Sequence, residues 1–443
     1  MKFNWKKNAA LFLTGQALSF FGTMVVQYAI LWHITLKSQS GSMMTVFTIA
    51  GLLPMFFISP FAGVWADRFN RKYIINIADG ATAFFSLAAA VFIILGINSY
   101  AILLICAFVR SIGQGVQTPA VGAFIPQIIP EKHLTKVNGF QGSIQSFVTL
   151  TSPMLSGALM SFAPLEIIFF LDVITALIGI SIVFFFVKIP EKEFLNGAQE
   201  PNSAHEPALA LEPNGAHEPA LAQKLSTQEP ALALEKANNT AYFYDLKEGV
   251  KYIRKHKFIL RMIVVSAFFL FLIAPAAFLT PLQVTRNFGQ EVWRLSAIEI
   301  SFSAGMMAGG VLIGIWGGFK NRIHTMAFSC LMCGVLTAGL GLVPSFWLYL
   351  VIMLLEGISL PLYNAPSMVL LQTVVEPAFM GRVISVFTMV SSTVMPMGMV
   401  LFGPAADIVS IDLILVVTGL LSALTAIPML ASRTLLRAGA GAI

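Results

Sequence analysis

Long apolar stretches follow one another along most of this chain, and a short polar or charged segment separates each from the next. A helix needs about 20 apolar residues to cross the roughly 30 Å hydrocarbon layer of a bilayer. Stretches of that length recur in two sets of six, and the Gly and Pro inside them are ordinary for membrane helices. We therefore predict twelve transmembrane helices. They lie near residues 9–36, 43–66, 73–96, 100–124, 139–162, 165–187, 259–282, 295–317, 324–343, 346–370, 382–406 and 409–431.

The composition agrees with an all-α integral membrane protein. Of the 443 residues, 57% are hydrophobic and 11% are charged, whereas a soluble domain carries about 25% charged residues. The formal net charge of +6 does not predict a nucleic-acid partner, because the basic residues recur at the ends of apolar stretches. Cys106, Cys330 and Cys333 lie inside such stretches, so we expect free, buried thiols that pack as small apolar groups.

The distribution of Lys and Arg predicts the orientation of the helices. Loops on the cytoplasmic side of a membrane carry an excess of basic residues. With the N-terminus in the cytoplasm, the opposite side receives only Lys37, Arg286 and Arg294. We therefore expect both termini in the cytoplasm. The cytoplasmic set comprises Lys2, Lys6, Lys7, Arg68, Arg71, Lys72, Lys132, Lys136, Lys320, Arg322, Arg382, Arg433 and Arg437.

A polar segment at 188–257 separates two helical units, at 1–187 and 258–443. Its middle repeats every twelve residues, as "EPNSAHEPALAL", "EPNGAHEPALAQ" and the more divergent "KLSTQEPALALE". Such units carry too little apolar surface to offset the entropy of ordering the chain. We interpret the repeats as a disordered cytoplasmic linker, with a docking site as the alternative.

The end of this segment has the pattern of an amphipathic helix. Phe243, Leu246, Val250 and Ile253 fall at helical spacing, and most of the neighbouring lysines and arginines lie off that stripe. A basic helix of this kind is typical of segments that lie on an anionic membrane surface.

The two sets of six helices share a charged loop. "GVWADRFNRK" follows the second helix and "GIWGGFKNRI" follows the eighth. The equivalent position in both sets indicates an internal duplication of a six-helix unit, an organisation found in transporters. The matched positions are Gly63 with Gly314, Trp65 with Trp316, Asp67 with Gly318, Asn70 with Asn321 and Arg71 with Arg322.

The first loop, G-x-x-x-D-R-x-x-R-K, resembles the signature loop of the major facilitator superfamily. The residues that carry this likeness are Gly63, Asp67, Arg68, Arg71 and Lys72. The resemblance implies the major facilitator fold, in which twelve transmembrane helices form two pseudo-symmetric six-helix bundles.

Two further patterns support that resemblance. "RSIGQG" in the fourth helix places Arg110 before glycines, as the superfamily does. "TSPMLSG" in the fifth helix is similar to the antiporter motif through Ser152, Pro153 and Gly157, although Ser152 and Ser156 stand where that motif has Gly.

The opening helix and "DLKEGVKYIRKHK" before the seventh helix resemble the macrolide-efflux branch of bacterial drug:proton antiporters. That likeness implies proton-driven efflux of macrolide- or tetracycline-like antibiotics, and hence antibiotic resistance. It also implies a monomer in the bacterial cell (inner) membrane. Export of an endogenous amphiphile, such as a siderophore or lysophospholipid, is the alternative.

A membrane enzyme or a sensor is a third hypothesis of a different class. The sequence contains no phosphate-binding G-x-x-x-x-G-K-[ST] loop, no G-x-S-x-G elbow and no H-E-x-x-H zinc motif, each of which has a known chemistry. We therefore expect no enzymatic activity, no cofactor and no metal.

The charged loop is a candidate gate. Asp67 is expected to end the second helix, and a carboxylate is stabilised beside helix N-termini and arginines. Such a contact can hold one state of the transporter and be released in the other. Asp79, two turns into the third helix, is expected to pair with the loop cations. For Arg68, Arg71 and Lys72 the alternative is that they have no gating role and only reflect the excess of basic residues in cytoplasmic loops.

Ionisable groups inside membrane helices are costly and usually have a task. Arg110 in the fourth helix aligns with Glu356 in the tenth, and by analogy with the superfamily these helices line a central cavity. We predict that the two side chains approach one another across it, and that Glu356 exchanges protons. A fixed structural pair is the alternative. Glu299 and Asp172 are weaker candidates for proton coupling.

Polar residues on the same helices are expected to face the substrate. They are Gln16 and Gln27 on the first helix, Gln114 and Gln117 on the fourth, and Tyr363 and Asn364 on the tenth.

Overall fold

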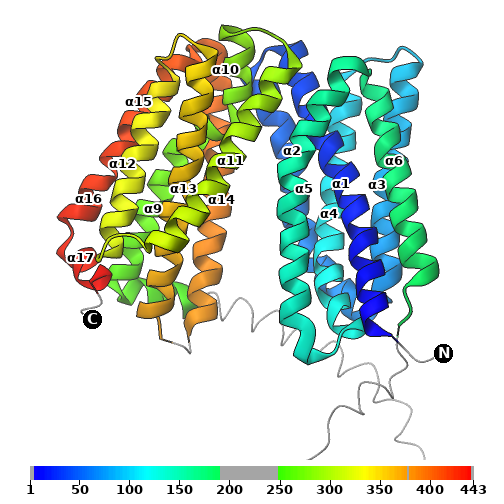
Figure 1. Ribbon diagram of the computed structural model, residues 1–443, viewed down its shortest axis with the longest axis horizontal. Helices are drawn as coiled ribbons and strands as arrows, with labels where there is room; N and C mark the ends of the chain where they lie inside the picture. Colours follow the sequence, from blue (N-terminus) through cyan, green and yellow to red (C-terminus); the bar gives the residue numbers. More distant parts are fainter. Residues whose placement is uncertain (1–3, 190–247, 377–378, 441–443) are drawn as a thin grey trace, which may run out of the picture.

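The computed structural model describes residues 4–189, 248–376 and 379–440, and its regular structure in these ranges is helical throughout. Two bundles stand side by side, the first coloured blue to green and the second green to red (Figure 1). The first bundle contains α1 (Trp5–Ser38), α2 (Gly41–Arg68), α3 (Arg71–Ile94), α4 (Tyr100–Ile128), α5 (Leu134–Phe162) and α6 (Leu165–Ser181). A π-helical turn, Ile182–Phe186, extends α6, and a 3-10 turn, Glu131–His133, precedes α5.

The second bundle repeats this order with more breaks. It contains α9 (Lys257–Phe278), α10 (Thr280–Asn287), α11 (Val292–Trp316), α12 (Arg322–Leu340), α13 (Phe346–Val374), α14 (Met380–Ile408), α15 (Ile411–Leu424), α16 (Ala426–Ala431) and α17 (Arg433–Gly439). Helix boundaries follow the predicted positions, but the seventh and twelfth helices are each divided. Pro281 and Pro428 lie just after the two breaks. Proline lacks the N–H that a continuous helix requires at that point.

The membrane-spanning character of the helices is confirmed for most of the chain. Eleven helices of the described ranges are long and apolar enough to cross a bilayer. The remaining predicted span is α5, whose 29 residues are sufficient in length but include Gln141, Gln145 and Thr149. These three side chains line a cavity, so polar residues lower the mean hydropathy of α5 on a face that is turned toward that cavity.

The two bundles pack by the same scheme, which supports the duplication. In the first bundle α1 packs on α6 and α2 on α4; in the second, α9 packs on α15 and α11 on α13. The duplicated loops also cap the next helix alike. Asn70 accepts a hydrogen bond from the Lys72 N–H at the start of α3, and Asn321 does so from the Ile323 N–H at the start of α12. At Gly317 and Gly318 the second loop adopts left-handed backbone (φ 72° and 81°), which favours glycine.

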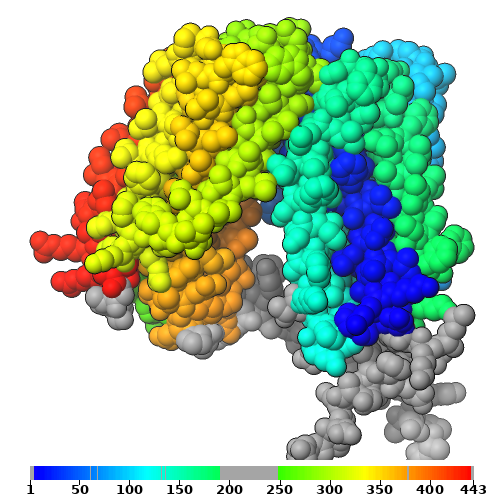
Figure 2. All heavy atoms as spheres, viewed as in Figure 1, coloured from blue at the N-terminus to red at the C-terminus, as the bar shows by residue number. Residues whose placement is uncertain are grey.

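The bundles touch through α2 against α14 and α5 against α11. Both chain termini lie near one end of the bundles (Figure 1), which we call the terminal face. The bundles meet near the other end, the opposite face, and Figure 2 shows an opening between them toward the terminal face. The space between the bundles therefore opens toward the terminal face in this view (Figure 2).

Several predicted features of the linker lie outside the described residues, namely the twelve-residue repeats, Phe243 and Leu246. The described part is helical from 248 to 255. There Tyr252 stacks on Phe379 with ring centroids 4.4 Å apart, and Ile253 is buried in the core of the second bundle. The apolar side of this segment thus packs on protein.

The α11–α13 contact provides a test of the packing. A Cβ atom at Gly357 would meet backbone atoms of Phe302 and Met306, whereas one at Gly310 would meet nothing within 4 Å. We expect Gly357→Val to destabilise the second bundle by about 1–3 kcal/mol, the usual cost of overpacking, and Gly310→Val to have little effect. Thermal unfolding of the purified variants in detergent measures both, and equal melting temperatures would contradict the close approach.

Candidate functional site

A buried ion pair lies inside the first bundle. The Arg110 guanidinium donates a 2.5 Å hydrogen bond to Asp172 on α6 and further bonds to the Ser86 hydroxyl (2.7 Å) and the Thr23 carbonyl (2.6 Å). The Ser86 hydroxyl also donates to Asp172 at 2.7 Å. Both charged side chains are at most 3% exposed. The two charges compensate each other within one bundle and tie α3, α4 and α6 together.

This pairing corrects one expectation. Arg110 and Glu356 occupy the same register of two 29-residue helices, α4 and α13, as the alignment predicts, but they do not pair across the central cavity. Arg110 is held by Asp172 in the first bundle, and Glu356 hydrogen-bonds within the second. The alignment predicted that the two residues lie at equivalent depth in the bundles. It could not predict the direction of the Arg110 side chain, whose partner lies on α6.

Asp79 is also placed differently from expectation. We expected it to pair with the loop cations, but its carboxylate accepts hydrogen bonds from the Ser19 hydroxyl (2.8 Å) and the Gln117 amide (2.7 Å). Gln117 in turn donates to Gln16 at 3.2 Å. Asp79 is 7% exposed. It therefore belongs to a hydrogen-bond network that leads from α3 to Gln117 and Gln16, which line a cavity of the first bundle.

Glu356 lies in the second bundle without a compensating charge. Its Oε1 atom accepts a 2.8 Å hydrogen bond from Thr337 and a 3.8 Å contact from the Cys333 thiol. Its Oε2 atom is buried and has no hydrogen-bond partner among the described residues. In the part of the chain that the structure describes, no Lys or Arg forms an ion pair with it. A carboxylate in this position is costly, whereas a neutral carboxyl group is tolerated.

A cavity of about 230 Å³ adjoins this carboxyl group. Glu299 from α11 and Glu356 from α13 both line it, among mainly apolar side chains. The apolar lining comprises Ile273, Ala276, Ala277, Phe302, Met353, Leu360 and Met395. Two acids that share one apolar cavity can take up and release protons or bind a cation.

A second cavity, of about 310 Å³, lies against the first bundle and has a polar wall. Gln16, Gln114 and Gln117, which we expected to face the substrate, line it together with Gln141 and Gln145 of α5. The sequence analysis did not include α5 in the cavity wall. The polar residues of α5, such as Gln141 and Gln145, could have indicated its place there. Such amides can both donate and accept hydrogen bonds.

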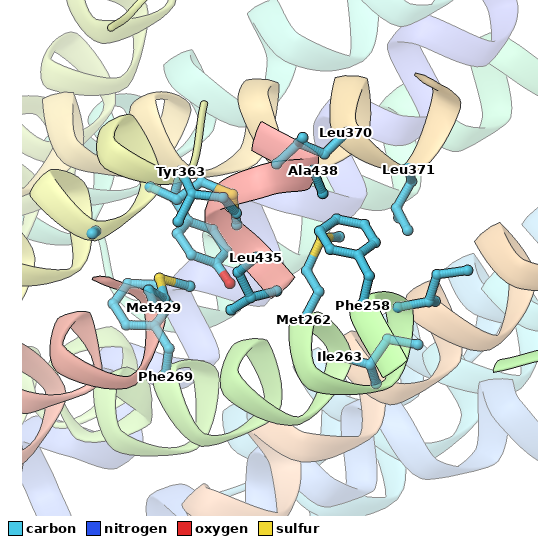
Figure 3. Close-up of a cluster of buried hydrophobic side chains, with 14 of the residues drawn as sticks. Phe258, Met262, Ile263, Phe269, Tyr363, Leu370, Leu371, Met429, Leu435 and Ala438 are labelled. Atoms are coloured by element: carbon cyan, nitrogen blue, oxygen red, sulfur yellow. The ribbon is translucent and has the colours of Figure 1, made fainter. Parts of the chain in front are cut away.

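The other predicted cavity residues have different positions. Gln27 lies beside Gly51 of α2, and Asn364 is exposed. Tyr363 is 2% exposed and lies among buried side chains of the second bundle, including Phe269 and Met429 (Figure 3). Its hydroxyl donates to Ser266 at 2.6 Å. Tyr363 is therefore part of the core, and its assignment to the cavity wall was wrong.

The charged loop holds the terminal face of the first bundle together. Arg71 donates to the carbonyls of Ala66 (2.7 Å) and Ala123 (2.9 Å), and Lys72 donates to that of Val187 (2.7 Å). Arg68 is exposed on the last turn of α2. The side chain of Asp67 lies outside the described part, so its predicted gating contact stays a prediction.

The motif in α5 lies where the two bundles touch. Ser296 of α11 donates to the Pro153 carbonyl at 3.4 Å, and a Cβ at Gly157 would overlap the Ser296 side chain. Ser152 is buried beside this contact. These residues let α5 and α11 approach closely, which places the motif at a joint between the bundles.

Comparison with known proteins gives consistent matches. The sequence profile described as Major Facilitator Superfamily matches residues 12–399. The chain is 29% identical to Macrolide efflux protein A of Streptococcus pyogenes over 414 residues, which is 92% of each chain. It is 28% identical to Macrolide efflux protein A of Enterococcus faecalis over 366 residues, 82% of this chain and 100% of that protein.

Solved structures share the fold at low sequence identity. A bacterial homologue of the iron transporter ferroportin in an inward-facing state superposes with a TM-score of 0.65 at 14% identity, covering 96% of this chain and 99% of that one. The xylose transporter XylE from E. coli in an inward-open conformation gives 0.62 at 13% identity, covering 99% of each chain.

The ion pair in the first bundle can be tested by removal of one partner and of both. We expect Arg110→Ala to destabilise the protein by about 3–5 kcal/mol, because it leaves Asp172 as a buried, uncompensated charge. Arg110→Ala combined with Asp172→Ala is expected to cost less than the sum of the single variants. Unfolding in mixed micelles measures these differences, with the exposed Arg261→Ala as control. Strict additivity would show that the two residues do not act as a pair.

Proposed function

The chain belongs to the Major Facilitator Superfamily, and we propose that it exports macrolides or similar lipophilic antibiotics, tetracycline-like drugs included, across the bacterial cell membrane by proton antiport. The similarity to macrolide efflux proteins over most of the chain supports drug efflux. The buried acids of the second bundle support the coupling to protons. The protein is proposed to work as a monomer, with both termini in the cytoplasm.

The uncompensated carboxyl group of Glu356 carries the proposal. The buried charge of the first bundle, Asp172, is paired with Arg110. Glu356 has one hydrogen-bonded oxygen and one without a partner, and it borders a cavity. It can remain neutral while buried and release its proton when the cavity opens to water.

The open side of the molecule supports alternating access. The proposed orientation, from the positive-inside rule, puts the terminal face in the cytoplasm. The space between the bundles is then open to the cytoplasm and closed to the outside. A substrate would enter from the cytoplasm or the inner leaflet and bind between the glutamine-rich wall of the first bundle and the acidic cavity of the second.

Proton uptake and drug release would then occur in the outward-open state. A proton that binds Glu356 from outside removes the negative charge, which weakens the hold on a cationic or polar drug and permits reburial of the side chain. The return to the inward-open state carries the proton inward. In this scheme the burial of the neutral carboxyl group is coupled to the outward movement of the cargo.

Neutralisation of Glu356 tests the coupling. We expect Glu356→Gln to reduce proton-driven macrolide efflux to the level of cells without the protein, because the amide cannot exchange a proton. Expression and membrane insertion should be normal, since Gln keeps the shape and the hydrogen bond from Thr337. Glu376→Gln, an exposed acid that follows α13, is the control. Full activity of Glu356→Gln under an imposed pH gradient would exclude Glu356 as the proton carrier.

The cargo is tested separately from the coupling. In cells that express the protein, we expect lower accumulation of a labelled macrolide than in cells without it, and an uncoupler should abolish the difference because it collapses the proton gradient. If macrolide accumulation is unchanged, while an amphiphile made by the cell itself appears in the medium in a protein-dependent manner, the endogenous export hypothesis replaces the drug hypothesis.

A further inference from the structure

Helices α2 and α14 form an antiparallel pair between the bundles. α2 runs from the opposite face to the terminal face, and α14 runs the other way (Figure 1). Each ends in the same spacing of Gly and Asp: Gly63 and Asp67 close α2, and Gly403 and Asp407 close α14. The pair therefore carries a glycine and an acid at each face of the membrane.

At the opposite face, Asp407 caps the first turn of α2. Its carboxylate accepts hydrogen bonds from the Gly41 N–H (2.7 Å), the Ser42 N–H (3.0 Å) and the Ser40 hydroxyl (2.9 Å). These N–H groups have no partner inside the helix, and the positive end of the helix dipole favours an anion there. The capping acid comes from the other bundle, so the cap also joins the two bundles.

Arg286, at the end of α10, reinforces the same junction. Its guanidinium lies 3.6 Å from Asp407. It also donates to the carbonyls of Ala406 (2.8 Å), in its own bundle, and Gln39 (2.5 Å), at the end of α1 in the first bundle. The carbonyl ends of two helices from different bundles thus share one cation, as the helix dipole favours.

The glycines show at which face α2 and α14 are in contact. A Cβ at Gly41 would meet the Gly403 carbonyl, and one at Gly403 would meet Thr45 and the Gly41 carbonyl. At the terminal face the corresponding glycines are Gly63 near the end of α2 and Gly381 at the start of α14, where an added Cβ would meet no atom of the described residues within 4 Å. One glycine pair is in helix contact, and its counterpart is open.

We propose that α2 and α14 have two equivalent contact sites, one at each face, and that these contacts form alternately during transport. Asp407 is the gating acid of the contact site at the opposite face. In the present state Asp407, Gly403 and Gly41 hold that face closed. When the terminal face closes, Gly63 and Gly381 come into contact and the Asp407 cap is released. This proposal depends on alternating access but not on the cargo or on proton coupling.

Distance measurements between the bundles test the proposal without transport. Spin labels at Lys136 at the start of α5 and His324 at the start of α12, both exposed, report the separation of the bundles at the terminal face in lipid nanodiscs. The native cysteines are buried and are retained, with the unlabelled parent as background. The measured quantity is the ratio of long to short distances, which is the ratio of terminal-face-open to terminal-face-closed molecules.

We expect Asp407→Ala to lower that ratio about ten-fold, because hydrogen bonds to a charged group are lost in one state only. Asp412→Ala is the matched control. Asp412 also accepts hydrogen bonds near the opposite face, from Gln283 and Asn287, but these partners belong to its own bundle. A ratio for Asp407→Ala equal to that of Asp412→Ala would overturn the proposal.

The glycines give a second, independent readout. Gly403→Val is expected to lower the ratio, since the valine side chain would obstruct the contact between α2 and α14 at the opposite face. Gly381→Val fits the present state, in which the terminal face is open, and obstructs only the state in which that face is closed. It should therefore raise the ratio, and it should reverse the effect of Asp407→Ala when the two substitutions are combined. Gly381→Val decides the matter even if Gly403→Val does not fold. A shift of the combined variant in the same direction as Asp407→Ala would also overturn the proposal.

Discussion

An ionised group inside the membrane must be paired, hydrated or neutralised by a proton, and the two bundles satisfy this constraint in different ways. In the first, Arg110 and Asp172 pair within hydrogen-bond distance and are both buried. In the second, Glu356 occupies the register of Arg110, and Thr337 and Cys333 are its hydrogen-bond donors among the described residues. A duplicated helix thus carries one member of a buried ion pair in one copy and, in the other, a buried acid that forms no ion pair with any described residue.

This difference assigns different tasks to the bundles. Because its charges are neutralised internally, the first bundle can keep one internal arrangement while it offers a glutamine-rich wall to a polar part of a substrate. The second bundle holds the acids beside a mainly apolar cavity, so its energy depends on protonation. The proposed proton exchange at Glu356 would therefore act in the second bundle and leave the ion pair of the first bundle unchanged.

The helices, the duplication and the membrane class were predictable from sequence, because apolar length and loop charge are local properties. The partners of the buried polar and charged side chains were not predictable. Arg110 was assigned to Glu356 from depth alone, while its partner Asp172 lies on a helix that the alignment did not consider. Tyr363 was assigned to the cavity because it is polar and lies on the correct helix, but its hydroxyl finds Ser266 inside the core. Side-chain direction depends on how each helix is rotated in the bundle, and a stretch that is apolar on nearly every side does not encode that rotation.

Antiparallel packing of α2 and α14 explains why similar Gly and Asp spacings close both helices. When two antiparallel helices cross at a glycine, the backbones approach closely and the C-terminal turn of each lies next to the N-terminal turn of the other. An acid one turn beyond the glycine can then cap the neighbouring helix, as Asp407 does for Gly41 and Ser42. Rocking of the bundles cannot bring both ends together at once, because separation at one face accompanies contact at the other. Contact at one face is therefore exchanged for contact at the other, so the junction of Asp407, Gly403 and Gly41 at the opposite face is linked to the separation of Gly63 and Gly381 at the terminal face.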